Sequence, residues 1–588
     1  MKRQIREDTL HEWNRRYTEG PTASGTTDVY IAQKFIKSES INMHLTQGSV
    51  AGPILWNLLI DPLLTSFKRR GDYCQAFADD AVLVVDGETA LEIEMKANAA
   101  LGHAQEWGFR NKLKFAAHKT NAITITRKLK YDTPRLSVAG VSIEMAKEIK
   151  ILGVTVDDKL TFNSHVSNVC RKAINIYKKL SRAARASWGL HPDVIRTIYT
   201  AVIDPVILYA ASVWAPAANK VGTQKQLGIV QRGIAQKICR AYRTVSLHSA
   251  LILAGVLSLD LRVREVAALY EAKRGSPVPQ LCGREVEKMT WAAGMPHPAE
   301  HTGIGVTRLV NQDDVEMHMY STFESSQMAV KSTPELGPHS QSGTAELLAL
   351  CVATKEAPTI RARTFGVYSD SMAALQTIQN YSCLHLLAVQ ARENIKHISR
   401  EGKTICLHWI KAHAGLEGNE RADELAKGAA IYTKRKPDYD RCPSAYIKRG
   451  IRTATLDEWN RRYKAGETAS ITKLFFPDAK AAYKVVRKFV PTYLTTQILT
   501  GHGGFSEYLS RFKCKVNPSC VCDPVQAETI QHLLLECPIH VLERFEFEQR
   551  VQQNLTLETI QELISGNNRE LFIKYCTKIV EKVTSRNK

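Results

Sequence analysis

Apolar and polar positions alternate along this chain in patterns that predict both helices and strands. Residues 160–275 follow a mostly helical pattern, whereas residues 41–130 combine an apolar helix with an apolar strand. An α/β pattern fills residues 319–432, and the Gly- and Pro-containing stretch 276–318 is typical of a connector. Helices and a Cys/His cluster complete the chain. The pattern therefore predicts a multidomain α/β protein.

Length and charge narrow the class of protein. A chain of 588 residues suggests three or four domains, and 44% hydrophobic with 23% charged residues argues against wholesale disorder. Lys and Arg number 79 against 59 Asp and Glu, which gives a formal net charge of +20. Such an excess favours a polyanionic partner, because each cation placed on a phosphate releases counterions. The alternative is a merely soluble basic protein.

The cysteines and the apolar stretches bear on the cellular compartment. The start, MKRQIRED, is charged and lacks the apolar core of a secretory signal. The longest apolar stretch, 201–218, contains Asp204 and two prolines and is too broken for a membrane span. We expect an intracellular protein, nuclear or cytoplasmic, that is not secreted and has no membrane partner. In such a reducing compartment, we interpret clustered Cys residues as metal ligands in preference to disulfides.

A repeat joins the two ends of the sequence. Thr9–Ser24 and Thr455–Ser470 are identical at 12 of 16 positions, at an offset of 446 residues that is far too long for a solenoid. We interpret residues 1–36 as a duplicated or rearranged segment that belongs near the carboxyl end. A true paired structural motif is the alternative.

The segment after this repeat carries a candidate catalytic turn. Gln47–Pro53 leads into an apolar helix, in which Pro53 suits the first turn. Asp79 and Asp80 follow at a predicted strand–turn–strand, where paired carboxylates are suited to Mg²⁺. The helix is expected to bury one apolar face made by Ile54, Leu55, Leu58, Leu59 and Leu63.

QGSxxGP plus a helix, then FADD, WGFRNKLKFAAHKT and LGVTVDDKLTFNSHV, resembles the palm of reverse transcriptases. The resemblance is closest to non-LTR retrotransposons of the insect ribosomal-DNA-inserting kind. It implies a partial palm at 37–130 and a helical thumb-like region at 131–275. It places Asp79 and Asp80 at the metal site, and Gln47 and Gly48 near the incoming nucleotide and template. Lys119 is similar to a lysine proposed as general acid for the leaving pyrophosphate; the alternative is a solvated surface lysine.

One family feature is missing from this palm. A strand upstream of QGS normally carries another metal-binding Asp, in a pattern like DI..AFD. Residues 1–46 contain only Asp8 and Asp28, and we expect neither to lie in such a strand. Because loss of one member of a cooperating catalytic set can cost ~10⁴-fold or more, we expect negligible polymerisation by this chain alone.

The α/β segment 319–432 carries three acids at positions suited to one catalytic site. Glu346 lies on the first turns of a predicted helix, and Asp370 ends an apolar strand. Asp423 lies one turn inside another helix, for which Asn419 is a natural cap. Three such carboxylates, meeting over one sheet edge, can hold two Mg²⁺ ions and activate water. Each acid taken alone is more simply a helix-start charge or a turn residue.

The string HAGLEGNERADELA resembles the HxGxxGNExAD signature of type 1 ribonuclease H domains, and YSDS resembles their central strand. The resemblance implies cleavage of the RNA strand of RNA–DNA hybrids. It casts His413 as a mobile group that assists proton transfer or product release, rather than a simple loop histidine. The Asp of the family's first strand has no counterpart in Met319–Glu324, which puts catalysis in doubt but leaves hybrid binding possible, since shape and backbone contacts carry it.

A Cys/His pattern lies near the carboxyl end, after a basic helical linker at 433–500. Cys520, Cys522, His532 and Cys537 give CxC-x9-H-x4-C, which suits one structural tetrahedral Zn²⁺; Cys514 is a spare candidate. The alternative is free cysteines in a small core. This region, 501–588, also resembles the carboxyl-terminal zinc knuckle of the same retroelements.

The sequence thus predicts an α/β multidomain fold with an incomplete reverse transcriptase palm, a helical thumb, a ribonuclease H-like α/β domain and a small zinc-binding helical tail. We expect RNA, DNA and RNA–DNA hybrids as partners, with Mg²⁺ and Zn²⁺ as cofactors. The first hypothesis is a retroelement fragment that cleaves the RNA strand of hybrids and retains a remnant polymerase. The second is a nucleic-acid-binding relic with broken catalytic sites. A zinc-dependent interaction protein, the third, rests on the tail alone.

Overall fold

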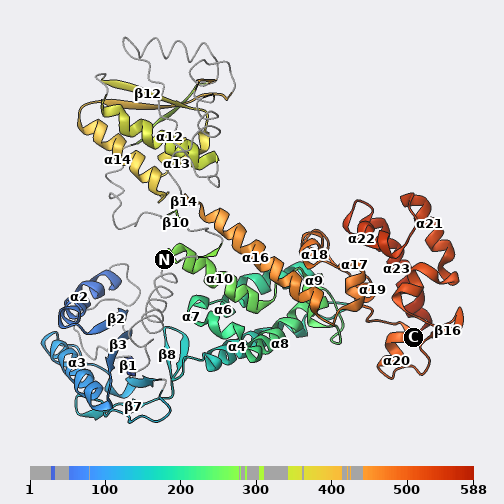
Figure 1. The fold of residues 1–588 in the computed structure, drawn as a ribbon, viewed down its shortest axis with the longest axis horizontal. Helices are drawn as coiled ribbons and strands as arrows, with labels where there is room; N and C mark the ends of the chain where they lie inside the picture. The colour runs from blue at the N-terminus through green and yellow to red at the C-terminus, as the bar shows by residue number, and fades with distance from the viewer. Residues whose placement is uncertain are drawn as a thin grey trace. The chain divides into compact units, whose positions relative to one another are not determined.

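In the computed structural model the chain divides into two units (Figure 1). The first contains Met1–Ala267 and Thr455–Lys588, and the second contains Ala268–Ala454. The structure describes residues 28–33, 52–78, 80–126, 128–276, 278–279, 285–287, 303–309, 342–359, 363–412, 420–421, 424 and 441–587.

A five-stranded sheet organises the amino-terminal part of the first unit, in the order β2-β3-β1-β4-β7. β2 and β3 form the expected hairpin, in which Phe77 pairs with Asp80. β1 lies between β3 and β4 and is antiparallel to both. The strands are β1 (Asp28–Gln33), β2 (Tyr73–Phe77), β3 (Asp80–Gly87), β4 (Asn121–Ile125) and β7 (Glu144–Met145).

Two helices, α2 (Gly52–Arg70) and α3 (Ala90–Arg110), pack on this sheet (Figure 1). α3 begins where the Thr89 hydroxyl accepts the Glu92 N–H, a standard amino-terminal cap. The expected apolar face of α2 is wrong for its first turns, since Ile54, Leu55 and Leu58 are exposed. The buried stripe instead follows the spacing i, i+3, i+7 and consists of Ile60, Leu63 and Phe67.

The chain then forms two small hairpins before it becomes helical. β5 (Ser137–Val138) pairs with β6 (Val141–Ser142), and β8 (Glu148–Ile151) pairs with β9 (Val154–Asp157). Strands therefore occupy the first part of the range 131–275, for which the resemblance implied a helical region. The helical pattern from residue 160 is confirmed by α4 (Asn163–Arg182), α5 (Pro192–Ile198), η3 (Tyr199–Ile203), α6 (Asp204–Ile207), α7 (Ala211–Trp214), η4 (Ala215–Asn219), α8 (Val221–Ile238), α9 (Leu247–Ala254) and α10 (Leu259–Lys273).

The carboxyl-terminal helices share one core with these helices, in which Trp214, Trp459, Phe505 and Phe572 are buried. The carboxyl copy of the repeat, Thr455–Ser470, covers the end of α16 and the start of α17, whereas residues 9–24 lie outside the described residues. The elements are α16 (Ser444–Ala465), α17 (Ser470–Phe475), α18 (Ala479–Val486), α19 (Tyr493–Thr500), α20 (Ser506–Arg511), β15 (Ser519–Cys520), β16 (Asp523–Ala527), η9 (His532–Glu536), η10 (Pro538–His540), α21 (Val541–Val551), α22 (Leu557–Ser565) and α23 (Arg569–Arg586).

The second unit contains a parallel sheet of three strands in the order β11-β13-β12. α12, α13 and α14 bury their apolar faces against it. β11 lies within the range expected to be a connector, so that range contributes a strand to this sheet. The elements are β11 (Val306–Arg308), α12 (Ser342–Glu356), η8 (Ala357–Thr359), β12 (Thr364–Ser369), α13 (Met372–Gln379), α14 (Leu386–Arg400) and β13 (Thr404–Trp409), with β10 (Glu285–Val286) paired to β14 (Arg441–Cys442).

Within the described residues, no single helix has the length and apolar character to cross a bilayer. One pair of helices, Pro192–Ile207 and Ala211–Asn219, bent by 56°, passes on length and composition alone.

Candidate catalytic and metal sites

In the second unit, chain direction brings Glu346 and Asp370 to one edge of the sheet. Ala357, just after α12, packs with Phe365 at the start of β12, so the chain reverses between helix and strand. A helix of 15 residues at ~1.5 Å each spans about the length of six strand residues at ~3.3 Å. The amino-terminal turns of α12, which carry Glu346, therefore lie toward the carboxyl end of β12, where Asp370 follows.

Hydrogen bonds fix the turn that carries Asp370. The Trp409 indole Nε1–H donates to the Asp370 carbonyl oxygen over 3.0 Å, which ties the ends of β12 and β13 together. The Ser369 hydroxyl accepts the Ser371 N–H at 3.1 Å, and the Ser371 hydroxyl accepts the Ala374 N–H at the start of α13. The Asp370 side chain, partly exposed, is thus held on a well-defined turn at the carboxyl edge of parallel strands.

Arg308 is a cation at the same edge of the sheet, and it was not predicted from the sequence. Arg308 pairs in register with Trp409, which in turn pairs with Ser369. The Arg308 guanidinium carbon lies 4.7 Å from the centroid of the Trp409 ring, a cation–π contact. No sequence signal marked it, because its position depends on β11 joining the sheet across a gap of about a hundred residues.

The other expected members of this site, Asp423, His413 and the expected cap Asn419, lie outside the described residues, as does Met319–Glu324. Glu420 and Arg421 are helical, as the expected helix at this point requires.

In the first unit, the register of the sheet places Asp80 and Lys119 at the same end. Asp80 begins β3, and the turn before it is held by the Trp56 Nε1–H, which donates to the Ala78 carbonyl at 2.7 Å. Lys119 is exposed and lies two residues before Asn121, which pairs with Gln33 of β1. Gln33 pairs in turn with Val82, two residues after Asp80. Asp79, Gln47 and Gly48 lie outside the described residues.

A strand upstream of Gln47 is present although its sequence lacks the expected pattern, since Asp28 begins β1 at the centre of the sheet. The register nevertheless keeps it from the catalytic turn, because Asp28 pairs with Gly87 at the far end of β3. Gln33 lies five positions further along β1, which is about 17 Å of extended chain. Lys34, Phe35 and Ile36, which follow Gln33 in sequence, carry no carboxylate.

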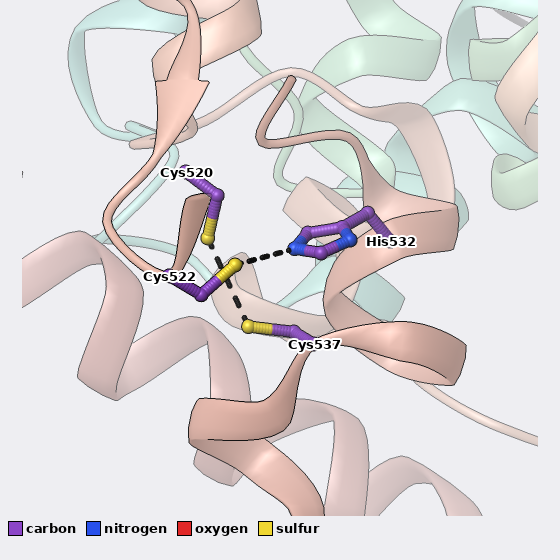
Figure 2. A group of neighbouring side chains, drawn as sticks. All are labelled: Cys520, Cys522, His532 and Cys537. Carbon is purple, nitrogen blue, oxygen red and sulfur yellow. Dashed lines mark hydrogen bonds between the residues drawn. The ribbon is translucent and has the colours of Figure 1, made fainter. Parts of the chain in front are cut away.

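The four carboxyl-terminal ligand candidates come together in the first unit (Figure 2). One ligand atom from each of Cys520, Cys522, His532 and Cys537 lies within 4.8 Å of all the others. The Sγ atoms of Cys520 and Cys537 are 3.8 Å apart, and Cys522 Sγ is 3.1 Å from His532 Nε2. A tetrahedral Zn²⁺ with Zn–S bonds of about 2.3 Å has S···S edges of about 3.8 Å. The donor set and its geometry therefore fit zinc.

Local structure explains the convergence of these ligands. A tight β15–β16 hairpin supplies Cys520 and Cys522, and the helical turn His532–Glu536 separates His532 from Cys537. His532 Nδ1 lies 3.5 Å from the Glu536 carboxylate, and Nε2 is the ring nitrogen that faces Cys522 Sγ. Desolvation, followed by the neighbouring thiols, raises the pKa of Cys522 to about 12 without a cation, so a bound cation is what would stabilise thiolates here. The spare candidate Cys514 is outside this cluster and donates to the Phe512 carbonyl.

Comparison with known proteins accounts for both enzyme-like regions. Residues 14–156 match the family model of the reverse transcriptase (RNA-dependent DNA polymerase), and residues 319–431 match that of RNase H. The chain therefore has one region similar to reverse transcriptases and another similar to RNase H. The first match begins at residue 14 and so includes β1 and part of the segment 1–36.

Three relatives show the wider similarity. The "Putative 115 kDa protein in type-1 retrotransposable element R1DM" of Drosophila melanogaster is 31% identical over 250 residues, 42% of this chain and 24% of the relative. A "Retrovirus-related Pol polyprotein from type-1 retrotransposable element R1" of Nasonia vitripennis is 28% identical over 220 residues, 37% of this chain and 65% of the relative. An "RNA-directed DNA polymerase from mobile element jockey" of Drosophila funebris is 25% identical over 284 residues, 47% of this chain and 30% of the relative. The chain therefore spans less than two thirds of each of them.

Proposed function

We propose that the chain acts on RNA–DNA hybrids, with the RNase H-like unit cleaving the RNA strand and the reverse transcriptase-like region remaining as a non-polymerising, nucleic-acid-binding remnant. The proposal is supported by the chain reversal between α12 and β12, which turns the first turns of α12, with Glu346, toward the end of β12 that Asp370 follows. The RNase H match over residues 319–431 includes both acids.

The chemistry of these donors fits Mg²⁺, which prefers carboxylate oxygens and retains several water molecules. Glu346, Asp370 and Asp423 would hold the cations, which when bound supply an activated water and stabilise the leaving oxygen. Asp370 presents its carboxylate from a turn fixed by Trp409 and Ser371. His413 would accept or deliver a proton beside the scissile phosphate, the role its signature implies.

Positive charge on the protein would contribute to binding of the hybrid. The formal net charge is +20, and Arg308 adds a guanidinium on the same sheet edge as Asp370. A guanidinium can contact a phosphate through two N–H groups, so Arg308 would hold a backbone phosphate near the acids.

The carboxyl-terminal cluster has a different role in this proposal. Three cysteines and a histidine fill all four positions of a tetrahedral zinc, so no position is left open for chemistry. We propose a structural Zn²⁺ that holds the β15–β16 hairpin against the helical turn His532–Glu536.

The decisive experiment measures hydrolysis of an end-labelled RNA–DNA hybrid in Mg²⁺. Asp370→Asn is expected to abolish cleavage while it preserves the size of the side chain. Glu401→Gln is the matched control, because Glu401 is a partly exposed acid after α14, three residues before β13 and so near the opposite edge of the same sheet. Cleavage that persists in Asp370→Asn contradicts the proposed site.

The second candidate is a nucleic-acid-binding relic without catalysis. It is favoured by the register of β1, which leaves Asp28 remote from Asp80, and by the lack of an Asp in Met319–Glu324. This candidate predicts salt-dependent hybrid binding, with no cleavage by the native chain in either Mg²⁺ or Mn²⁺.

A further inference from the structure

We propose that an aromatic cluster around α20, formed by His502, Tyr508 and Phe512 with Arg511, is a stacking site for single-stranded nucleic acid. This inference goes beyond the proposed function. The cluster belongs to the first unit, whereas the proposed cleavage site belongs to the second.

The rings form a continuous group that ends at the protein surface. The Tyr508 and Phe512 ring centroids are 4.7 Å apart, and those of His502 and Tyr508 are 5.0 Å apart. Phe512 is the outermost ring of the group, and 43% of this residue is exposed. A base-stacking surface requires an aromatic ring that is exposed in this way.

The inner members of the cluster are fixed by hydrogen bonds to the loop after α8. The Thr244 hydroxyl lies 2.8 Å from the Tyr508 hydroxyl and 2.9 Å from His502 Nδ1. That loop is itself held by Arg232, which donates to the carbonyl oxygens of Arg243 and Val245. The rings are therefore presented in one orientation, and little conformational entropy remains to be lost when a base stacks on them.

The positive charges around the cluster are complementary to the phosphates of a nucleic-acid strand. The Arg511 guanidinium carbon lies 5.6 Å from the Tyr508 centroid and 5.4 Å from that of Phe512. Lys513 and Arg243 are also exposed, and Glu507 is the acid on α20. Burial, with Arg511 and Arg232 nearby, lowers the pKa of His502 to about 4, so its ring is neutral at pH 7 and can stack.

These features together favour a single strand over a duplex as the occupant. A duplex hides its base faces within its own stack, whereas a single strand offers them to exposed aromatic rings. Cations beside the rings then contact the adjoining phosphates. RNA and DNA share this chemistry, so the experiment includes both.

The test measures the affinity of the full chain for fluorescein-labelled twelve-residue oligo(U) and oligo(dT) by anisotropy. Phe512→Ala is expected to weaken binding about fivefold or more, and Phe512→Trp is expected to restore it. Phe545→Ala is the matched control, because Phe545 is a phenylalanine on α21 that is 57% exposed. Arg511→Gln is expected to reduce the dependence of log affinity on log salt by about 0.7 for a single strand.

Each outcome has one meaning. Zinc content and the circular dichroism spectrum of Phe512→Ala, if native, show that the fold is intact. Equal affinity of Phe512→Ala and Phe545→Ala for both oligonucleotides overturns the stacking site. Weaker binding of oligo(U) alone assigns the site to RNA, and of oligo(dT) alone to DNA. Loss of hybrid cleavage in Asp370→Asn leaves this binding unchanged, so failure of either proposal can be recognised separately.

Discussion

Asp28 pairs with Gly87 across β1 and β3, at the end of the palm-like sheet remote from Asp80. β1 thus takes the central position of the sheet but brings Gln33, rather than an acid, toward the catalytic turn. The sheet forms and its core packs with Gln33 at this position.

The first prediction concerns DNA synthesis by the reverse transcriptase-like region. We expect primer extension by the chain on an RNA template to stay at background in both Mg²⁺ and Mn²⁺, because a metal site without one bridging acid loses ~10⁴-fold or more in rate. Asp80→Asn should then equal the native chain in a gel-based extension assay. Extension by the native chain that disappears in Asp80→Asn would show that another group replaces the missing ligand.

The cluster of Cys520, Cys522, His532 and Cys537 predicts a metal-dependent tail. Native protein is expected to contain about one zinc per chain, measured by mass spectrometry of the purified protein. Cys520→Ser should lose it and unfold the hairpin, because binding energy of a structural zinc is also folding energy. Cys514→Ser, which changes an exposed cysteine outside the cluster, should retain full zinc. Equal zinc in both variants would exclude the four-ligand site.

A buried acid links α10 to α16 within the first unit. Asp260 is 3% exposed and accepts a hydrogen bond of 2.6 Å from Arg462. Asp260→Asn is expected to lower the free energy of unfolding by about 2 kcal/mol, since a charge-assisted bond at a buried site is lost. Arg461→Ala is the control, because Arg461 is exposed and pairs with Glu458; we expect a change within about 0.5 kcal/mol. Urea unfolding followed by tryptophan fluorescence measures both, and equal midpoints would contradict the assignment.

His165 predicts a loss of stability in mild acid. Its ring is 2% exposed, its Nδ1 accepts the Thr155 N–H at 3.3 Å, and burial lowers its pKa from 6.5 to about 4. Below pH 6.5 the unfolded chain takes up a proton that the folded chain excludes, so stability falls as pH drops from about 6.5 to about 4. The contribution of this one group is about 3 kcal/mol.

The matching variant is His165→Asn, which keeps an acceptor near Nδ1 and does not titrate. Thermal melts between pH 4 and 7 should show a shallower decline for this variant than for the native chain. An unchanged slope would mean that other histidines with lowered pKa values, such as His248 and His502, account for the whole effect.

Local sequence signals predicted many elements of this fold, including the hairpin at Asp80, the helix at Glu346 and the strand before Asp370. These signals failed where packing between distant segments decides which side chains are buried and which residues come into contact. The first turns of α2 have the same apolar spacing as its buried stripe, yet Ile54 and Leu58 are exposed. The aromatic cluster at Phe512 likewise depends on Thr244, which is far away in the chain.

The sequence by itself determined the ligand types, since the short spacing of Cys520, Cys522, His532 and Cys537 lets one hairpin and one helical turn bring them together. It also determined that no Asp or Glu occupies positions 29–38, because residue identity is independent of folding. Only the tertiary structure decided that Asp28 is remote from Asp80 and that Arg308 shares an edge with Asp370. The reason is that strand order and register arise from pairing between segments far apart in the chain, and a local pattern does not specify which segments will meet.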